Sequence, residues 1–192
     1  MIRRSADNIL AQLGLKKKLD MFGLGCREYV DTGKIGGIAL SECSAATIYE
    51  AARHVKVAAV EVELSMFSWD ILTNGVAVAC AEHGIPIAAY SPIGRGSDAL
   101  AHNLQLVDKI HALAASKGCM LAQLAIAWVR SISSRPGMPT VIPIPGSTTV
   151  SRVRENSTVV ELSNAELEEI GNVLEGFETA GARYPQGIPT EL

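Results

Sequence analysis

The residues best suited to chemistry lie in the stretch VIPIPGSTTVSRVRENS, residues 141–157. An apolar run that is typical of a strand leads through Gly146 and Ser147 into a short polar segment. If Thr148 or Thr149 begins a helix there, the first backbone N–H groups of that helix are free and its N-terminus carries a partial positive charge. Such a terminus attracts anions, and phosphate is the typical ligand.

Three polar side chains of this expected helix lie on one side of it. Glu155 and Asn156 follow Arg152 at i+3 and i+4, which are neighbouring positions on a helix surface. Arg152 can present its guanidinium to a phosphate while Glu155 and Asn156 contact a neighbouring sugar or base, whereas Arg154 faces elsewhere. A surface helix with an internal ion pair explains the same pattern. The residues alone leave both interpretations open.

Short β-branched runs alternate with helical patterns along the chain, which predicts parallel βα units. Strands are expected at residues 19–22, 34–40, 57–66, 85–91 and 141–144. Helices are expected at residues 5–13, 44–54 and 71–82, then from a cap at Asn103 to Gly118, from about Leu121 to Ile132, and from a capping box at Ser163 to Leu174. The tail over residues 177–192 contains Gly and Pro and is expected to be loose.

Five such units fit either a doubly wound sheet or part of a (β/α)8 barrel, and periodicity does not choose between them. A complete barrel takes about 250 residues and rarely fewer than 200, so a barrel of 192 residues would be incomplete. In both architectures ligands bind at the carboxyl ends of the strands. Hydroxyl and glycine residues are frequent at those positions, which are Ser41-Glu42 and residues 63–65, 90–96 and 146–148.

Composition excludes several classes of protein. With 48% hydrophobic residues, 19% charged residues and a net charge of −3, the chain is an ordinary globular protein without the basic stripe of a nucleic-acid binder. The four cysteines form no CxxC pair and no HExxH motif is present, so we expect reduced thiols and no metal site. Neither a signal peptide nor a run of roughly 20 apolar residues is present, so we expect a cytoplasmic protein that does not bind membranes.

Several segments carry a resemblance to a known family. IPGS…R..EN follows the last expected strand, AYSPIGRG follows the strand before it, and GKIGGIALSE comes earlier. In these segments the chain resembles the aldo/keto reductase family, and RRSADNILAQLGLKKKLDMF and AAVEVELSMFSWDI are most similar to its fungal pyridoxal reductase branch. The resemblance runs from about Ile2 to the C-terminus. It implies a partial (β/α)8 barrel, with residues 1–192 as one domain that binds NADP(H) and reduces small aldehydes or ketones, pyridoxal among the candidates.

The resemblance also implies roles for single residues at the nicotinamide and pyrophosphate end of the cofactor. Tyr90 corresponds to the aromatic residue that stacks on the nicotinamide, and Ser41 to the serine that hydrogen-bonds its carboxamide. The family's neighbouring asparagine is Glu42 here, and its glutamine on the next strand is Glu61. The loop along the pyrophosphate corresponds to Ser91, Ile93 and Arg95.

At the adenosine end the implied residues belong to the stretch over residues 141–157. Ser147 and Arg152 match residues that hold the 2′-phosphate, while Glu155 and Asn156 match residues that contact the adenine. Gly146 stands where many members of the family have a phosphate-binding lysine. The resemblance therefore assigns this stretch to the adenosine phosphate of NADP(H).

No catalytic residue is expected in this chain. The family's catalytic tyrosine, aspartate and lysine belong to strands that would precede Met1, so the N-terminal strands of the barrel are expected to be missing. Gly23-Leu24-Gly25 stands where the catalytic histidine would be, and Tyr29 belongs to a helix-like segment and is interpreted as a packing residue. Whether the chain is an active reductase stays open.

The alternative is a non-catalytic interaction protein or a truncated gene product. A partial barrel exposes strand edges at residues 19–22 and 141–144, which can pair with another copy or with a full-length relative. This alternative therefore predicts that the chain associates with itself through these edges.

Overall fold

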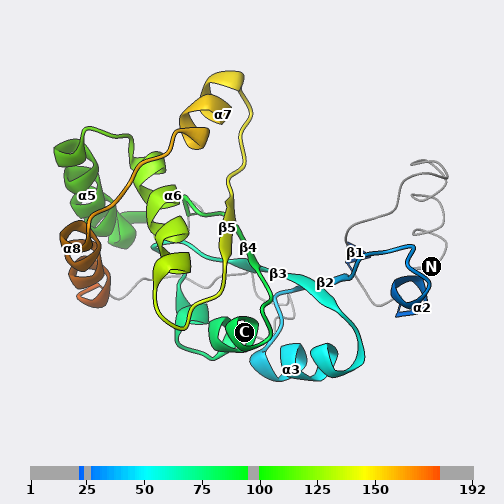
Figure 1. Ribbon diagram of the computed structural model, residues 1–192. Coiled ribbons are helices and arrows are strands. Elements are labelled where there is room, and N and C mark those ends of the chain that lie inside the picture. Colours follow the sequence, from blue (N-terminus) through cyan, green and yellow to red (C-terminus); the bar gives the residue numbers. More distant parts are fainter. Residues whose placement is uncertain (1–21, 24–26, 95–99, 178–192) are drawn as a thin grey trace.

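Five parallel strands form one sheet whose spatial order is the order of the chain (Figure 1). The computed structural model describes residues 22–23, 27–94 and 100–177. The strands are β1 Phe22–Gly23, β2 Ile38–Ser41, β3 Val57–Glu63, β4 Ile87–Tyr90 and β5 Val141–Ile144. This order confirms the predicted succession of parallel βα units.

The helices connect the strands and extend beyond the last one. They are α2 Arg27–Asp31, α3 Ala45–His54, α4 Val76–Glu82, α5 Leu100–Lys117, α6 Leu121–Ser131, α7 Val150–Ser157 and α8 Asn164–Glu175, with 3-10 turns at Asp70–Leu72 and Ile132–Ser134. Among the described residues, no single helix has both the length and the apolar composition to cross a membrane, although two helices bent by 92°, Leu106–Lys117 and Leu121–Ser134, meet both criteria together.

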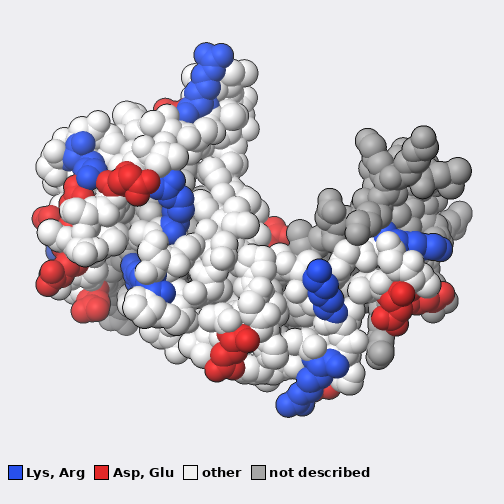
Figure 2. Space-filling view, viewed as in Figure 1, with Lys and Arg blue, Asp and Glu red and all other residues white. Residues whose placement is uncertain are grey.

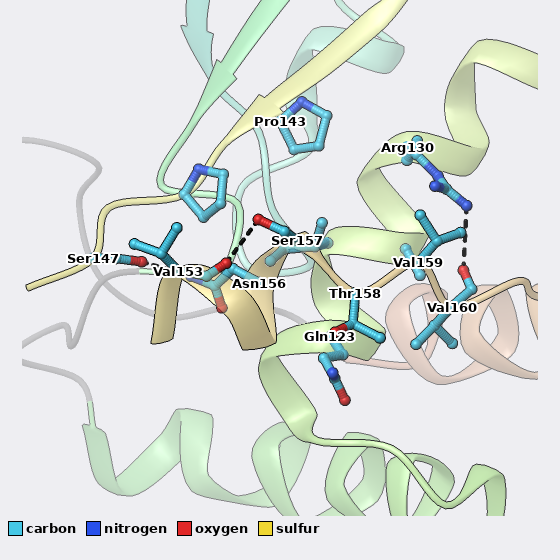
Figure 3. A pocket seen from close by; sticks show the side chains of 13 residues that line it. Gln123, Arg130, Pro143, Ser147, Val153, Asn156, Ser157, Thr158, Val159 and Val160 are labelled. Atoms are coloured by element: carbon cyan, nitrogen blue, oxygen red, sulfur yellow. Dashed lines mark hydrogen bonds between the residues drawn. The ribbon is translucent and has the colours of Figure 1, made fainter. Parts of the chain in front are cut away.

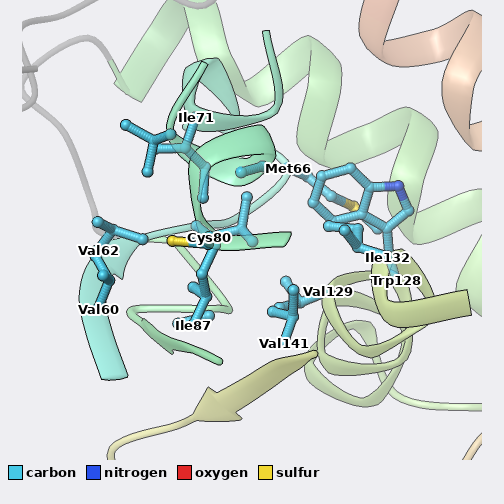
Figure 4. Close-up of a cluster of buried hydrophobic side chains, with 14 of the residues drawn as sticks. Val60, Val62, Met66, Ile71, Cys80, Ile87, Trp128, Val129, Ile132 and Val141 are labelled. Atoms are coloured by element: carbon cyan, nitrogen blue, oxygen red, sulfur yellow. The ribbon is translucent and has the colours of Figure 1, made fainter. Parts of the chain in front are cut away.

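One face of the sheet, which we call the outer face, forms the hydrophobic core with the helices. Val60, Val62, Ile87, Ala89 and Val141 point to this face and are buried against α3, α4 and α6. Figure 4 shows the Trp128 and Val129 side chains of α6 meeting this layer. Burying one such aliphatic side chain is worth about 1.5–3 kcal/mol, so this face supplies much of the stability of the sheet.

The opposite face, the inner face, carries different residues. The register places Ser41 beside Glu61, Glu63 beside Tyr90, and Tyr90 beside Ile144. Residues side by side in a parallel pair point to the same face. Glu61 and Ile144 are exposed, whereas Glu63 is buried. The inner face is therefore open and partly polar.

Most predicted elements are confirmed, and two are corrected. Asn103 lies inside α5, which begins at Leu100, so it does not cap that helix. The helix expected at residues 71–82 is divided, because Asn74 accepts a hydrogen bond from the Val76 N–H (3.1 Å) and Gly75 has a left-handed φ of 94°. The expected helix at residues 5–13, most of the strand at 19–22 and the tail at 178–192 lie outside the described residues.

Two strands are shorter than predicted, each for a local reason. The strand expected at residues 57–66 ends at Glu63, because Ser65 and Ser68 exchange backbone hydrogen bonds of 2.9 and 3.1 Å and close a tight turn. The strand expected at residues 34–40 begins only at Ile38. Gly37 lies directly before it, where a Cβ would come within 2.9 Å of the Lys56 carbonyl oxygen, so only glycine fits between the chains.

The predicted capping box at Ser163 is confirmed, and the glutamate of this box also links α8 to α5. The Ser163 hydroxyl accepts from the Glu166 N–H (3.3 Å), and the Glu166 carboxylate accepts from the Ser163 N–H (2.7 Å). The Lys117 ammonium, at the end of α5, lies 2.8 Å from the same carboxylate. Lys117 and then Ser163 hold the pKa of the Glu166 carboxyl at about 2, below its ordinary value of 4.5.

We expect Glu166→Gln to lower the midpoint of thermal unfolding at pH 7. Near pH 2 the two proteins should unfold at the same temperature. The native state favours the ionised carboxyl, so its stabilisation is present above pH 4.5 and disappears as the pH falls toward 2. Circular dichroism melts of both proteins from pH 7 to pH 2 measure this difference. Glu169→Gln, at an exposed position of the same helix, is the control. A loss of equal size at every pH contradicts the prediction.

Candidate functional site

The side chain of Glu42 joins the carboxyl ends of three strands. Its Oε1 accepts a hydrogen bond from the Tyr90 hydroxyl (2.7 Å) and another from the Glu63 N–H (2.8 Å). Its own N–H donates to the carbonyl of Glu61 (3.0 Å). Glu42 follows β2, Glu61 and Glu63 belong to β3, and Tyr90 ends β4. One carboxylate thus fixes the relative positions of β2, β3 and β4 where ligands bind to parallel sheets.

Two residues at this edge have a left-handed backbone. Glu42, after β2, and Ser91, after β4, both have φ near 49°. For a residue other than glycine this conformation costs roughly 1–2 kcal/mol. Strain of this kind persists where the surroundings enforce it, and it is frequent at functional sites. The edge is therefore held in a conformation that the local sequence does not favour.

The loop after Tyr90 packs closely on an aromatic ring. Gly94 has a φ of 87°, and a Cβ at this position would lie 2.6 Å from Phe67 Cδ2. The Gly94 N–H donates to the Ser91 carbonyl (2.8 Å), which closes a turn with the half-buried Ile93 inside it. Arg95, the next predicted site residue, lies outside the described residues.

The helix expected after Thr148 or Thr149 is confirmed as α7, with Thr149 as its cap. The Thr149 hydroxyl accepts from the Arg152 N–H (3.3 Å). The Asn156 amide donates to the Ser147 hydroxyl (2.9 Å), which ties the turn after β5 to the last part of the helix. These two contacts fix the start of α7 and the Ser147 and Asn156 side chains.

Both arginines of α7 extend into solvent. Arg152 and Arg154 are exposed, and neither guanidinium forms an ion pair with any described residue. The ion pair with Glu155, which would explain the pattern without a ligand, is thus not formed. Figure 2 shows basic side chains protruding at the α7 tip, above a largely uncharged surface. A free guanidinium beside a helix N-terminus suits an anion.

A cavity of about 560 Å³ lies beside α7, between this helix, β5 and α6. Ser147, Val153 and Asn156 line one end of it, and Arg130 and Val160 line the other (Figure 3). Arg130 is held there, because it donates to the Glu161 carboxylate (2.7 Å) and to the Val160 carbonyl (3.4 Å). The Ser147–Asn156 pair therefore lies at one end of a cavity that is lined by both polar and apolar side chains.

The predicted site residues form two groups on one edge of the sheet. Ser41, Tyr90 and Ser91 lie at the ends of β2 and β4, around Glu42, with Glu61 nearby on β3. The residues Gly146, Ser147, Arg152, Glu155 and Asn156 lie after β5, which pairs with β4. Because Ile144 is the partner of Tyr90 in this pairing, both groups leave adjacent strands at the same edge.

Sequence reasoning missed the structural role of Glu42. The sequence places Glu42 directly after an expected strand and shows it as a departure from the family pattern, but does not reveal that it is the acceptor that joins three strands. A charged residue directly after a strand was the available signal. Its partner Tyr90 lies 48 positions away, so spacing gave no indication of the contact.

Other side chains have structural roles. Tyr29 is buried in α2 with the Lys34 ammonium 5.4 Å from its ring centre, which confirms its interpretation as a packing residue. Cys43 and Cys80 are buried, and burial raises the pKa of the Cys80 thiol to about 12, which makes it unreactive. Within the described ranges, no group of three His, Cys, Asp or Glu residues could hold a metal ion.

Comparison with known sequences identifies close relatives. The sequence model of the aldo/keto reductase family matches residues 24–175. A probable pyridoxal reductase of Schizosaccharomyces pombe is 30% identical over 236 residues, covering 100% of this chain and 70% of the relative. A putative pyridoxal reductase of Saccharomyces cerevisiae is 34% identical over 193 residues, covering 82% of this chain. An NADP(+) aldo-keto reductase of S. pombe is 34% identical and covers 86% of it. The chain spans 56% of the length of each of these last two.

Solved structures show the same fold. A thermostable aldo-keto reductase in complex with the inhibitor epalrestat superposes with a TM-score of 0.72 at 22% identity, over 88% of this chain and 65% of that one. An aldo-keto reductase from Klebsiella pneumoniae in complex with NADPH gives a TM-score of 0.70 at 24% identity, over 90% of this chain and 64% of that one. These proteins are (β/α)8 barrels, so the five-stranded sheet is part of such a barrel and the predicted fold class is confirmed.

Replacing Glu42 with Ala is expected to lower the free energy of unfolding by about 1–3 kcal/mol, because the Tyr90 hydroxyl and the Glu63 N–H lose their common acceptor. Tyr90→Phe should cost less in this background than in the native protein, with a coupling energy of about 0.5–3 kcal/mol. Urea unfolding of both single variants and of the double variant measures the coupling. Strictly additive effects rule out the interaction as a source of stability.

Proposed function

Because this chain belongs to the aldo/keto reductase family of oxidoreductases, we propose that it binds NADP(H) along the carboxyl edge of its sheet, with residues 1–192 acting as one domain. The observation that carries the proposal is the free guanidinium of Arg152, next to the Ser147–Asn156 pair and the capped start of α7. A guanidinium, a hydroxyl and free backbone N–H groups are together the donors that a phosphate monoester requires. The residues present therefore fit the adenosine 2′-phosphate.

The adenosine half of the cofactor would be held by α7 and the turn before it. Arg152 would face the 2′-phosphate with Ser147, while Gly146 leaves the backbone accessible. Glu155 and Asn156 would contact the adenine from the adjacent positions of the helix. The Ser147–Asn156 hydrogen bond supports this arrangement, because it brings the phosphate-binding and adenine-binding positions together.

The nicotinamide half would be held at the ends of β2, β3 and β4. Tyr90 would stack on the ring, Ser41 would hydrogen-bond the carboxamide, and Glu61 lies on the same face as Ser41. Ser91, Ile93 and Arg95 would follow the pyrophosphate between the two halves. The common edge of β4 and β5 supports this order, since Tyr90 and Ile144 are neighbours there.

The reaction that we propose is the interconversion of a small carbonyl compound and its alcohol. Bound NADP(H) supplies or accepts the hydride in this chemistry. Two yeast relatives are named as pyridoxal reductases, which makes pyridoxal the first substrate to test. A proton must also reach the carbonyl oxygen, and we assign no described side chain to that step. Cofactor binding is therefore the part of the proposal that the chain's own residues support.

Arg152→Ala is expected to weaken NADPH binding at least tenfold, because a charge-assisted hydrogen bond to phosphate is worth about 1.5–3 kcal/mol. Arg154→Ala, on the same helix but on another side of it, should change the affinity less than twofold. Titration of each protein with NADPH, followed by cofactor fluorescence, gives the dissociation constants. Equal losses in the two variants, or no saturable binding to the native chain at millimolar NADPH, contradict the proposed site.

A second candidate function is association with another copy of the chain. Large exposed hydrophobic side chains are concentrated on β5, α7 and the segment after it, and they are Ile142, Ile144, Val150, Val153 and Val159. Among the described strands, β5 pairs only with β4, so its other edge is open. An apolar, unpaired edge strand favours pairing with another chain.

If the unpaired lateral edge of β5 binds a second copy, the native chain should form dimers at micromolar concentration and Ile144→Lys should be monomeric. Val78→Lys is a matched control, because Val78 is 44% exposed on α4 and Ile144 is 43% exposed. Light scattering coupled to size exclusion measures the molar mass of each protein. A native chain that stays monomeric at high concentration contradicts this second function.

A further inference from the structure

The inner face of the sheet carries negative charge where the nicotinamide is proposed to bind. Glu61 is exposed on this face beside Ser41, and Glu63 follows two residues later on the same strand. Glu61 forms no ion pair with a described residue. Alternation along β2 to β5 places on this face only neutral or acidic residues, which are Ala39, Ser41, Ala59, Glu61, Glu63, Ala88, Tyr90, Ile142 and Ile144. The charge of Glu61 is thus not balanced on the strands of its own face.

A hydrogen bond to a carboxylate also raises the electron density of the Tyr90 ring on this face. The Tyr90 hydroxyl donates to the Glu42 carboxylate at 2.7 Å, a short distance that is typical of a charge-assisted bond. Donation to an anion increases the electron density of the phenol ring. An electron-rich ring attracts a cation placed over its face more strongly than a neutral group. Glu42 therefore acts on a stacked ligand through Tyr90, and it also holds Tyr90 in position.

We propose that the nicotinamide end of this site selects the oxidised cofactor, so that NADP⁺ binds more tightly than NADPH. The inference rests on the proposed function, because it takes the nicotinamide to lie over Tyr90. The oxidised nicotinamide is a pyridinium cation, whereas the reduced ring is neutral. Both the Glu61 carboxylate and the Tyr90 ring attract the cation and have little effect on the neutral ring.

The remaining parts of the two cofactors are the same. The adenosine, the pyrophosphate, the 2′-phosphate and the carboxamide occur in NADP⁺ and in NADPH alike, so α7 and Ser41 contribute equally to the two affinities. Only a group that senses the charge of the ring can separate them. In this site, the exposed Glu61 and the half-buried Glu42–Tyr90 pair are the described groups placed to do so, whereas Glu63 is buried.

Isothermal titration calorimetry of NADP⁺, NADPH and 2′,5′-ADP tests the inference by binding alone. We expect the native chain to bind NADP⁺ about tenfold more tightly than NADPH, with the Glu61 carboxylate and the Glu42–Tyr90 pair each contributing about threefold in a partly solvated site. Glu61→Gln should reduce this ratio to about threefold, and Glu61→Gln with Glu42→Gln should bring it close to one. Glutamine keeps an acceptor for the Tyr90 hydroxyl and the Glu63 N–H, so the second change removes charge while the strand contacts remain.

Two controls separate the possible results. Glu168→Gln, at an exposed position on α8, should leave the ratio unchanged. The affinity for 2′,5′-ADP, which has no nicotinamide, should be the same in all variants. If 2′,5′-ADP binds and the native ratio is one or lower, or if the ratio is insensitive to both glutamate changes, the charge selection is wrong and the adenosine site stands. If 2′,5′-ADP and both cofactors fail to bind, the proposed function is wrong together with this inference.

Discussion

Parallel pairing in chain order places every strand's carboxyl end on one edge of the sheet, and the other features of the molecule depend on this constraint. Each connection must return across one face, so α3, α4 and α6 bury the outer face with Val60, Ile87 and Val141. The described helices α3, α4 and α6 all pack on the outer face and leave the inner face to other groups. Polar side chains can therefore occupy it, and Glu61 and Tyr90 do so at the edge where the strands end.

The parts of the fold that the sequence predicted correctly are those with local causes. Strand order follows from the alternation of short and long apolar patterns, and the cap of α8 follows from serine and glutamate three positions apart. Asn103 had the residue type of a cap but lies within α5, which begins at Leu100. The break before α4 was missed, since only the Asn74-Gly75 pair marks it.

The two halves of the candidate site also differ in whether the local sequence could predict them. The residues around α7 could be grouped from sequence, because Thr149, Arg152 and Asn156 are positions on one helix or its cap. The Glu42–Tyr90 contact could not, because it joins residues 48 positions apart that become neighbours only when β2, β3 and β4 pair. The left-handed backbone of Glu42 was equally hidden, since nothing in the local sequence favours it.

The two hydrogen bonds that Glu42 accepts from Tyr90 and Glu63 do not by themselves require a charge. The Tyr90 hydroxyl and the Glu63 N–H need an acceptor oxygen, and the amide oxygen of a glutamine or asparagine provides one at less cost of desolvation. A half-buried carboxylate on a strained backbone costs more free energy than such an amide. Its additional effect is on electrostatics, through the Tyr90 ring and together with Glu61 on the inner face. These two hydrogen bonds therefore account for an oxygen at this position, and the proposed selection of a cationic ring would give the carboxylate a further role.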